Sequence, residues 1–199
     1  PKYDYEETSW DNTVSENLGK PFIHLEDNLD SLFYEISLHA KKYVCDVLEY
    51  KDIFDYVITK SWLSRARRPD NEIRWHFHST SHISFVYYLS TPDNSHALEF
   101  QNTCTKNDLF KAMNVEDEDT ADRNMVKNYN PLNSPAFYMH PIEGHLVLFP
   151  SSLSHHTRFM GGDFKGERLG IVGDITLMLK EDQLNFSMGY IDNKYWKKY

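Results

Sequence analysis

The chain has 199 residues, a formal net charge of −9 and an aromatic fraction of 15%, so it is long enough for one domain with a substantial core. The acidic balance excludes a general positive field for phosphates or anionic lipid head groups, and we expect neither nucleic acid nor a membrane as a partner. No apolar run is long enough to span a bilayer, so we expect a single cytoplasmic domain over residues 1–199, and the sequence leaves its oligomeric state open.

The N-terminal quarter of the chain combines a polar arm with one helix. Residues 1–25 are polar and acidic with scattered aromatic side chains, a pattern that indicates an extended arm or an edge strand. Over residues 26–50, apolar side chains recur every three or four positions, which is the stripe of an amphipathic helix. Asn28 or Asp30 is placed to cap its start, and Cys45 falls on its apolar side. We therefore expect a supporting helix at residues 26–50.

Residues 53–180 follow the pattern of short strands separated by turns. The strand-like segments are DYVITKSWLS, EIRWHFHS, HISFVYYLS, HALEFQN, GHLVLFP, SHHTRFM and RLGIVGDITLMLK. A long polar insertion at 102–139, partly helical around KNDLFKAM, interrupts them, and a lid over a site and a loose excursion are equally good interpretations of it. One helix followed by many short strands predicts a mainly β fold, a sandwich or barrel of antiparallel strands.

The segment EIRWHFHS carries two histidines, His76 and His78, that a strand would project from the same face. They would lie about 7 Å apart along the strand, a spacing at which both can bind one metal ion. His155 or His156, on a later strand, can supply a third ligand. For any single histidine a hydrogen-bonded place at a sheet edge is the simpler interpretation. Two imidazoles on one inward face, however, need partners that a packed core rarely provides.

Arg168 begins an apolar strand thirteen residues after His155. A guanidinium that points inward there is costly unless it meets an anion, and its planar pair of donors suits a carboxylate. A surface ion pair with a neighbour such as Glu167 is the alternative. An inward Arg168 beside a metal would indicate a site for a carboxylate ligand.

Taken together, the segments HFHSTSHISFVYYL, EGHLVLFPSSLSHH and ERLGIV resemble the iron(II)- and 2-oxoglutarate-dependent oxygenase superfamily. The group they resemble within it is one of 2OG-Fe(II) oxygenases with an HxH...H pattern, found in marine bacteria and phages. Its pattern is H-x-H-x-x-S-x-x-S-x-x-Y-Y-L, then G-x-L-x-L-F-P-S-x-L-x-H, then E-R. The resemblance runs from about Trp62 to Asp174 and implies a double-stranded β-helix, the cupin-like jelly roll, with its core over 53–180.

The resemblance also implies a cofactor, a cosubstrate and their ligands. The implied Fe(II) ligands are His76, His78 and His155. Arg168 corresponds to the arginine that pairs with the distal carboxylate of 2-oxoglutarate. Tyr88, or Tyr87 if the register is shifted by one, corresponds to the aromatic residue that lines the cosubstrate pocket. The implied reaction uses O2 and couples oxidative decarboxylation of 2-oxoglutarate to hydroxylation of a substrate, either a small molecule or a protein side chain, with no catalytic residue beyond the metal ligands.

The chain departs from the superfamily pattern at two positions. His78 stands where most members have a carboxylate ligand, and Gly170 stands where many have a serine that helps to hold the cosubstrate. A neutral face of three histidines also resembles cupin-type dioxygenases, which use no 2-oxoacid. A cupin-like metal dioxygenase without 2-oxoglutarate is therefore one alternative function. A noncatalytic jelly-roll binding module, with a structural zinc or no metal, is the other.

Overall fold

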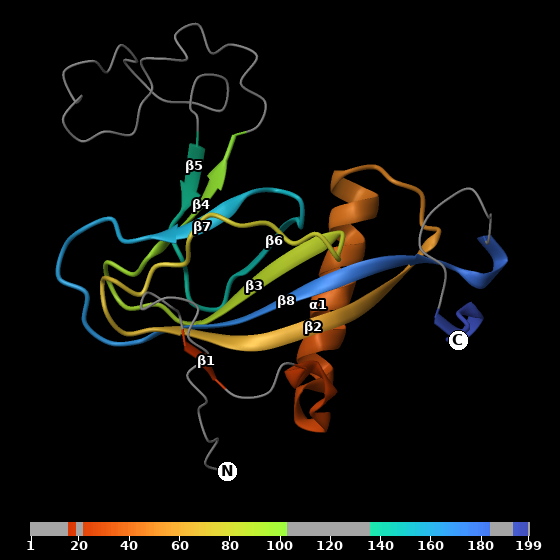
Figure 1. Ribbon diagram of the computed structural model, residues 1–199, viewed down its shortest axis with the longest axis horizontal. Helices are drawn as coiled ribbons and strands as arrows, with labels where there is room; N and C mark the ends of the chain where they lie inside the picture. The colour runs from red at the N-terminus through yellow and green to blue at the C-terminus, as the bar shows by residue number, and fades with distance from the viewer. Residues whose placement is uncertain (1–15, 19–21, 103–135, 184–192, 199) are drawn as a thin grey trace, which may run out of the picture.

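Two antiparallel sheets stacked face to face, with one helix across the outer face of the larger sheet, make up the computed structural model (Figure 1). The structure describes residues 16–18, 22–102, 136–183 and 193–198. The larger sheet has the strand order β1-β2-β8-β3-β6, and the smaller sheet has the order β5-β4-β7. The predicted mainly β fold, a jelly-roll class with a supporting helix, is confirmed.

The strands of the larger sheet are β1 (Glu16–Leu18), β2 (Phe54–Ala66), β8 (Arg168–Leu179), β3 (Ile83–Ser90) and β6 (Leu146–Pro150). Those of the smaller sheet are β5 (Ala136–Met139), β4 (Ala97–Gln101) and β7 (His155–Arg158). β1 pairs with the end of β2 as an edge strand, one of the two forms expected for the N-terminal arm. The rest of that arm up to residue 21 lies outside the described residues.

The helix forms where the apolar stripe predicts it, but it is shorter than expected. It runs as α1 (Asp30–Lys42), follows a single-turn 3-10 helix at Asp27–Leu29 and continues into a π-helical turn at Tyr43–Val47. No side chain caps its start, since the N-cap residue is Leu29. The expected caps Asn28 and Asp30 do not act as such, because the preceding 3-10 turn already leads the chain into the helix.

The helix covers the larger sheet through what we call the helix-side cluster. Its fully buried members are Ile23, Phe33, Ile36, Ala40, Val44, Ile83, Phe85, Ile171 and Ile175. The helical members recur at the three- and four-residue spacing of one helix face. Cys45 packs against this cluster, as expected, with its Sγ 3.7 Å from the Tyr56 hydroxyl. Burial of these side chains is what fixes α1 to the sheet.

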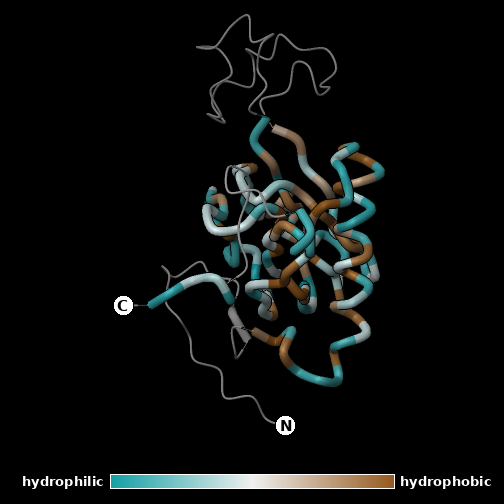
Figure 2. Tube along the Cα trace, turned by 90° about the vertical axis from the view of Figure 1, so that its right-hand side faces the viewer, coloured by the Kyte–Doolittle hydropathy of each residue, from teal (hydrophilic) through white to brown (hydrophobic). Residues whose placement is uncertain are grey.

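A second core, the inter-sheet cluster, lies between the two sheets. It consists of Val86, Tyr88, Leu98, Phe100 and Phe149. Figure 2 shows the hydrophobic stretches of the chain running through the middle of the molecule. On β3, Phe85 and Ile83 face the helix while Val86 and Tyr88 face the smaller sheet, which is the alternation expected of a strand buried on both faces.

The prediction of a strand at EIRWHFHS is wrong, because the segment runs beside β7 without forming a regular ladder of backbone hydrogen bonds. His76 and His155 exchange both backbone hydrogen bonds, at 3.0 and 2.9 Å. The next bond along is from the amide of Thr157 to the carbonyl of Ile73. Between these two bonds the segment advances by three residues, from Ile73 to His76, whereas β7 advances by two, from His155 to Thr157. The extra residue in the segment breaks the register of pairing. The segment remains irregular, and it crosses the end of the sandwich instead of extending a sheet.

The insertion predicted at 102–139 falls almost entirely outside the described residues, apart from Asn102 and strand β5 at its end. Its expected helix and its proposed role as a lid therefore stay predictions, as does the division of residues 1–199 into arm, helix and jelly-roll core. Within the ranges that the structure describes, none of the helices combines the length and the apolar character needed to cross a bilayer.

Candidate active site

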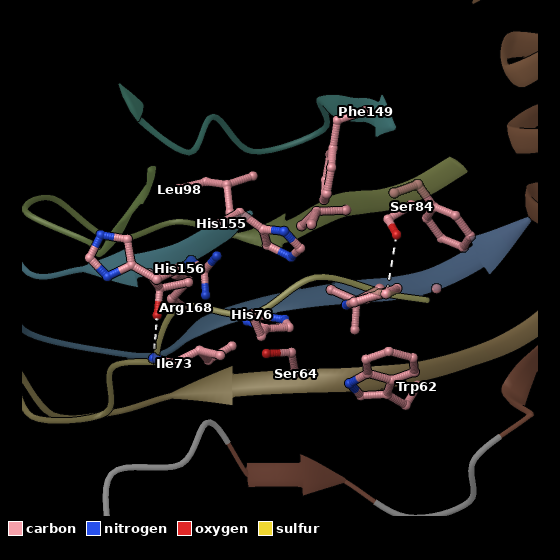
Figure 3. Close-up of a pocket in the computed structure, with 16 residues that line it drawn as sticks. Trp62, Ser64, Ile73, His76, Ser84, Leu98, Phe149, His155, His156 and Arg168 are labelled. Carbon is pink, nitrogen blue, oxygen red and sulfur yellow. Dashed lines mark hydrogen bonds between the residues drawn. The ribbon is translucent and has the colours of Figure 1, made fainter. Parts of the chain in front are cut away.

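A pocket opens between the two sheets at the end crossed by the irregular segment. It is lined by β2, β3, β4, β6, β7 and β8 and by residues of the segment itself. Figure 3 shows His76 and His155 facing each other, with Arg168 to one side and Trp62 to the other. Apolar side chains of the inter-sheet cluster complete the wall, among them Val86, Leu98 and Phe149. The pocket therefore places polar groups inside an otherwise apolar interior.

Three imidazoles converge in this pocket. The side-chain nitrogens of His76, His78 and His155 that could bind a metal all lie within 4.8 Å of one another. Their ring centroids are 4.2 Å apart for His76 and His155, 5.2 Å for His76 and His78 and 5.3 Å for His78 and His155. The three histidines expected as ligands are thus brought together, although two of them lie on an irregular segment and not on a strand.

Each of the three imidazoles has its Nδ1 occupied by an oxygen acceptor. Nδ1 of His76 lies 2.8 Å from the Arg74 carbonyl, and Nδ1 of His155 lies 2.8 Å from the Leu153 carbonyl. Nδ1 of His78 lies 2.5 Å from a carboxylate oxygen of Asp174. Carbonyl and carboxylate oxygens only accept, so each Nδ1 carries a hydrogen and donates it. This leaves all three Nε2 atoms with a free lone pair for a metal ion.

Burial disfavours the charged form of two of these imidazoles. It lowers the pKa of His155 to about 4, although the hydrogen bond to the Leu153 carbonyl raises it in part. Burial also lowers the pKa of His76. A metal ion competes with protons for the same lone pair, so a lowered pKa leaves the nitrogen available at neutral pH.

His156, the other candidate for the third ligand, is not part of the cluster. Its Nε2 lies 2.8 Å from a carboxylate oxygen of the buried Glu99, and its ring stacks on Trp75 with 3.9 Å between centroids. His155 and His156 are neighbours on β7, so their side chains leave the strand in opposite directions. Of these two histidines, His155 is the one that groups with His76 and His78.

Arg168 points into the interior. It is 5% exposed, and its Nε is buried with no hydrogen-bond partner among the described residues. The surface ion pair considered for it does not form, because Glu167 instead accepts from Nε of Arg67 at 2.6 Å. Arg168 is the first residue of β8, and residues of that strand at even steps from it face the pocket. A buried guanidinium with an unused donor is suited to an anionic ligand.

The two tyrosines considered for cosubstrate binding face opposite ways. Tyr88 is buried in the inter-sheet cluster, its hydroxyl has no hydrogen-bond partner among the described residues, and the Arg168 guanidinium carbon lies 5.3 Å from its ring centroid. Tyr87 packs against the helix-side cluster. The geometry therefore places Tyr88, and not Tyr87, beside Arg168.

Asp174 is the residue of this site that sequence reasoning missed. It lies on β8, six residues after Arg168 and on the same face, and accepts hydrogen bonds from His78 and from Ser84, the latter at 2.9 Å. Burial raises the pKa of its carboxyl, but the hydrogen bonds from His78 and Ser84 outweigh this, and its pKa lies below the ordinary value. The signal was available, since an acidic residue in the apolar run RLGIVGDITL needs a buried partner.

The jelly-roll fold and the three-histidine pocket together define a class, that of jelly-roll proteins with a candidate metal centre. Residues 60–174, more than half of the chain, match the family model described as "Putative 2OG-Fe(II) oxygenase". The chain belongs to this 2OG-Fe(II) oxygenase family. A search of curated proteins found no match.

Solved structures of similar fold include an oxidoreductase of the 2OG-Fe(II) oxygenase family from Burkholderia pseudomallei, with a TM-score of 0.50 and 12% identity over 82% of this chain and 62% of that one. AviO1 from Streptomyces viridochromogenes Tue57 gives 0.47 and 13% over 76% and 61%. A prolyl-4-hydroxylase from Pseudomonas putida gives 0.43 and 16% over 76% and 65%. The chain thus spans less than two thirds of the length of these proteins, and at such identities the likeness concerns the fold alone.

Proposed function

We propose that the protein is a non-haem Fe(II) oxygenase that couples the oxidative decarboxylation of 2-oxoglutarate, with O2, to the hydroxylation of a substrate. The observation that carries the proposal is the convergence of three Nε2 lone pairs in one pocket. Membership of the 2OG-Fe(II) oxygenase family supports the choice of metal and cosubstrate. The substrate, a small molecule or a protein side chain, stays a prediction at the level of its class.

The donor set fits a first-row transition metal. Imidazole nitrogen is a good ligand for Fe(II), and three ligands on one face leave coordination positions open for other molecules. Bound Fe(II) would supply the redox centre at which 2-oxoglutarate and O2 react. The residues of this chain that would hold it are His76, His78 and His155, and the apolar side chains of Leu98 and Phe149 beside them would limit the access of water to the centre.

The residue that would hold the cosubstrate is Arg168. 2-Oxoglutarate has a carboxylate at each end, so one end can bind the metal while the other meets a guanidinium. Arg168 lines the same pocket as the three histidines and has a buried, unused Nε. With Gly170 in place of a serine, the tyrosine ring of Tyr88 is the side chain that lies against it. A structural zinc site gives no reason for this buried arginine, whereas a carboxylate cosubstrate does.

Binding of 2-oxoglutarate is expected to depend on the metal. Under anaerobic conditions, equilibrium dialysis with labelled 2-oxoglutarate should show one molecule bound per chain in the presence of Fe(II), and binding at least about 10-fold weaker without it, because the chelating end then loses its partner. Succinate, which keeps the distal carboxylate and lacks the keto group, is the matched competitor and should bind more weakly. Equal binding of 2-oxoglutarate with and without Fe(II) would contradict the proposal.

A further inference from the structure

A chain of buried hydroxyl groups ends on Asp174, directly behind His78. The Ser81 hydroxyl donates to Ser151 at 2.8 Å, the hydroxyls of Ser151 and Ser84 are 3.0 Å apart, and Ser84 donates to Asp174 at 2.9 Å. Ser151 and Ser84 are 0% and 1% exposed. These are the three serines of the motif H-x-x-S-x-x-S and of the F-P-S turn, and nothing in the proposed reaction uses them.

The directions of these hydrogen bonds follow from the number of protons available. A hydroxyl donates only once, and Ser84 gives its proton to Asp174, so Ser151 must donate to Ser84 and in turn accept from Ser81. Nδ1 of His78 adds a further donor, 2.5 Å from Asp174 and 3.0 Å from the Ser84 hydroxyl. The serine hydroxyls therefore donate in one direction along the chain, and the last of them donates to Asp174, as His78 does. Asp174 accepts all of its hydrogen bonds, as a carboxylate does and a carboxylic acid does not.

Asp174 thus places a negative charge next to a metal face that has none of its own. An imidazole that binds a metal ion is a neutral ligand, and His78 occupies the position where a carboxylate ligand would otherwise contribute a charge. The Asp174 side chain is 3% exposed, so water does not screen its charge well. Glu99, the other buried carboxylate of the described residues near the pocket, is bound to His156 and does not touch the three histidines.

We propose that Asp174 is a positioning residue that acts through His78: it fixes the ring with Nε2 toward the metal and supplies the centre with the negative charge missing from its ligands. Ser81, Ser151 and Ser84 hold the carboxylate in place from behind. The inference rests on the proposed function to the extent that the three histidines bind a metal. The fixed tautomer of His78, however, is a property of the metal-free protein.

Two variants separate position from charge. Asp174→Asn keeps an oxygen that can accept from His78 but removes the charge. Asp174→Ala removes both, but it leaves the Ser84 hydroxyl, 3.0 Å from Nδ1 of His78, as a second acceptor, so position is tested in Asp174→Ala combined with Ser84→Ala. We expect Asp174→Asn to weaken binding of Co(II), used as an air-stable probe, by about 10-fold, and Asp174→Ala by up to about 100-fold, the range found when partners of metal-binding histidines are removed. Competition with a chromophoric chelator measures the affinity, and thermal unfolding identifies a variant that fails to fold.

Nitrogen-15 NMR of the imidazoles in metal-free protein shows directly which ring nitrogen of His78 carries the hydrogen. Wild type and Asp174→Asn should show His78 with its hydrogen on Nδ1 alone, and the double variant Asp174→Ala with Ser84→Ala, which lacks both acceptors at Nδ1, should show a mixture of tautomers. Ser61→Ala is the matched control, since Ser61 is a buried serine whose hydroxyl bonds His24 and not the site; it should leave Co(II) affinity and the His78 tautomer unchanged. Ser84→Ala should weaken Co(II) binding.

The outcomes keep the two proposals apart. Wild-type protein that binds no Co(II) would sink the proposed metal site, while the tautomer measurement would still test the role of Asp174. Full Co(II) affinity in Asp174→Asn would overturn the part played by charge. A single Nδ1–H tautomer of His78 in the double variant Asp174→Ala with Ser84→Ala would overturn the part played by position.

Discussion

Replacement of His155 with alanine is expected to reduce Fe(II) affinity by more than about 100-fold, beyond the loss that follows from removing the partner of a ligand. His155 lies between the other two imidazoles and Phe149 of the inter-sheet cluster, with its Nδ1 bound to the Leu153 carbonyl. Removing it leaves two nitrogens, which hold a divalent ion poorly. Anaerobic titration calorimetry with Fe(II) measures this change in affinity.

His156→Ala is the matched control for this prediction. The two residues are neighbours on β7 and both line the pocket, but His156 is bonded to Glu99 and lies outside the cluster of three. Its replacement should leave Fe(II) affinity within a few-fold of wild type. The reverse result, with iron binding lost in His156→Ala and kept in His155→Ala, would contradict the assignment of the site.

The second large effect is expected at Arg168. Arg168→Ala should weaken binding of 2-oxoglutarate to the Fe(II)-loaded protein by about 10- to 100-fold, the loss expected when one or two hydrogen bonds to a charged group disappear, and should leave Fe(II) affinity unchanged. Arg168→Lys keeps the charge but not the planar fork, so it should lie between the two. Titration of 2-oxoglutarate into anaerobic, iron-loaded protein gives these affinities.

Arg67→Ala is the matched control, because Arg67 is an arginine near Arg168 that forms a surface ion pair. Its Nε lies 2.6 Å from Glu167, and both side chains are 46% exposed. Such a pair contributes little to stability, and this variant should bind 2-oxoglutarate as wild type does. Equal affinity in Arg168→Ala and wild type would show that the cosubstrate carboxylate is held elsewhere.

The sequence was sufficient for features that depend on periodicity. The apolar stripe of residues 26–50 predicted a helix, and a helix formed, because burial of one face against a sheet requires that spacing. The segments HISFVYYLS and RLGIVGDITLMLK likewise predicted strands, and β3 and β8 form there. The start of the helix was predicted less well, since Asn28 lies in a 3-10 turn that local propensity does not reveal.

Features that depend on long-range pairing could not be predicted from the sequence in the same way. The segment EIRWHFHS has strand-like residues, but one extra residue against β7 breaks its ladder. The side chains of His76 and His78 still lie close together, as predicted, but they do so from an irregular segment and not from the predicted strand. Asp174 was missed because its partner His78 is 96 residues away, and no local pattern joins them. The roles of all these residues in binding metal and cosubstrate stay predictions.

The most direct test of the proposed function is to ask whether Fe(II) and 2-oxoglutarate meet in this pocket. A 2-oxoacid chelated to Fe(II) absorbs visible light by charge transfer from the metal to the ligand. The anaerobic, iron-loaded wild-type protein should develop this band on addition of 2-oxoglutarate and saturate at one equivalent per chain, and His155→Ala should show none. An iron-loaded protein whose visible spectrum does not change with 2-oxoglutarate would contradict the proposal and favour a metal centre that works without a 2-oxoacid.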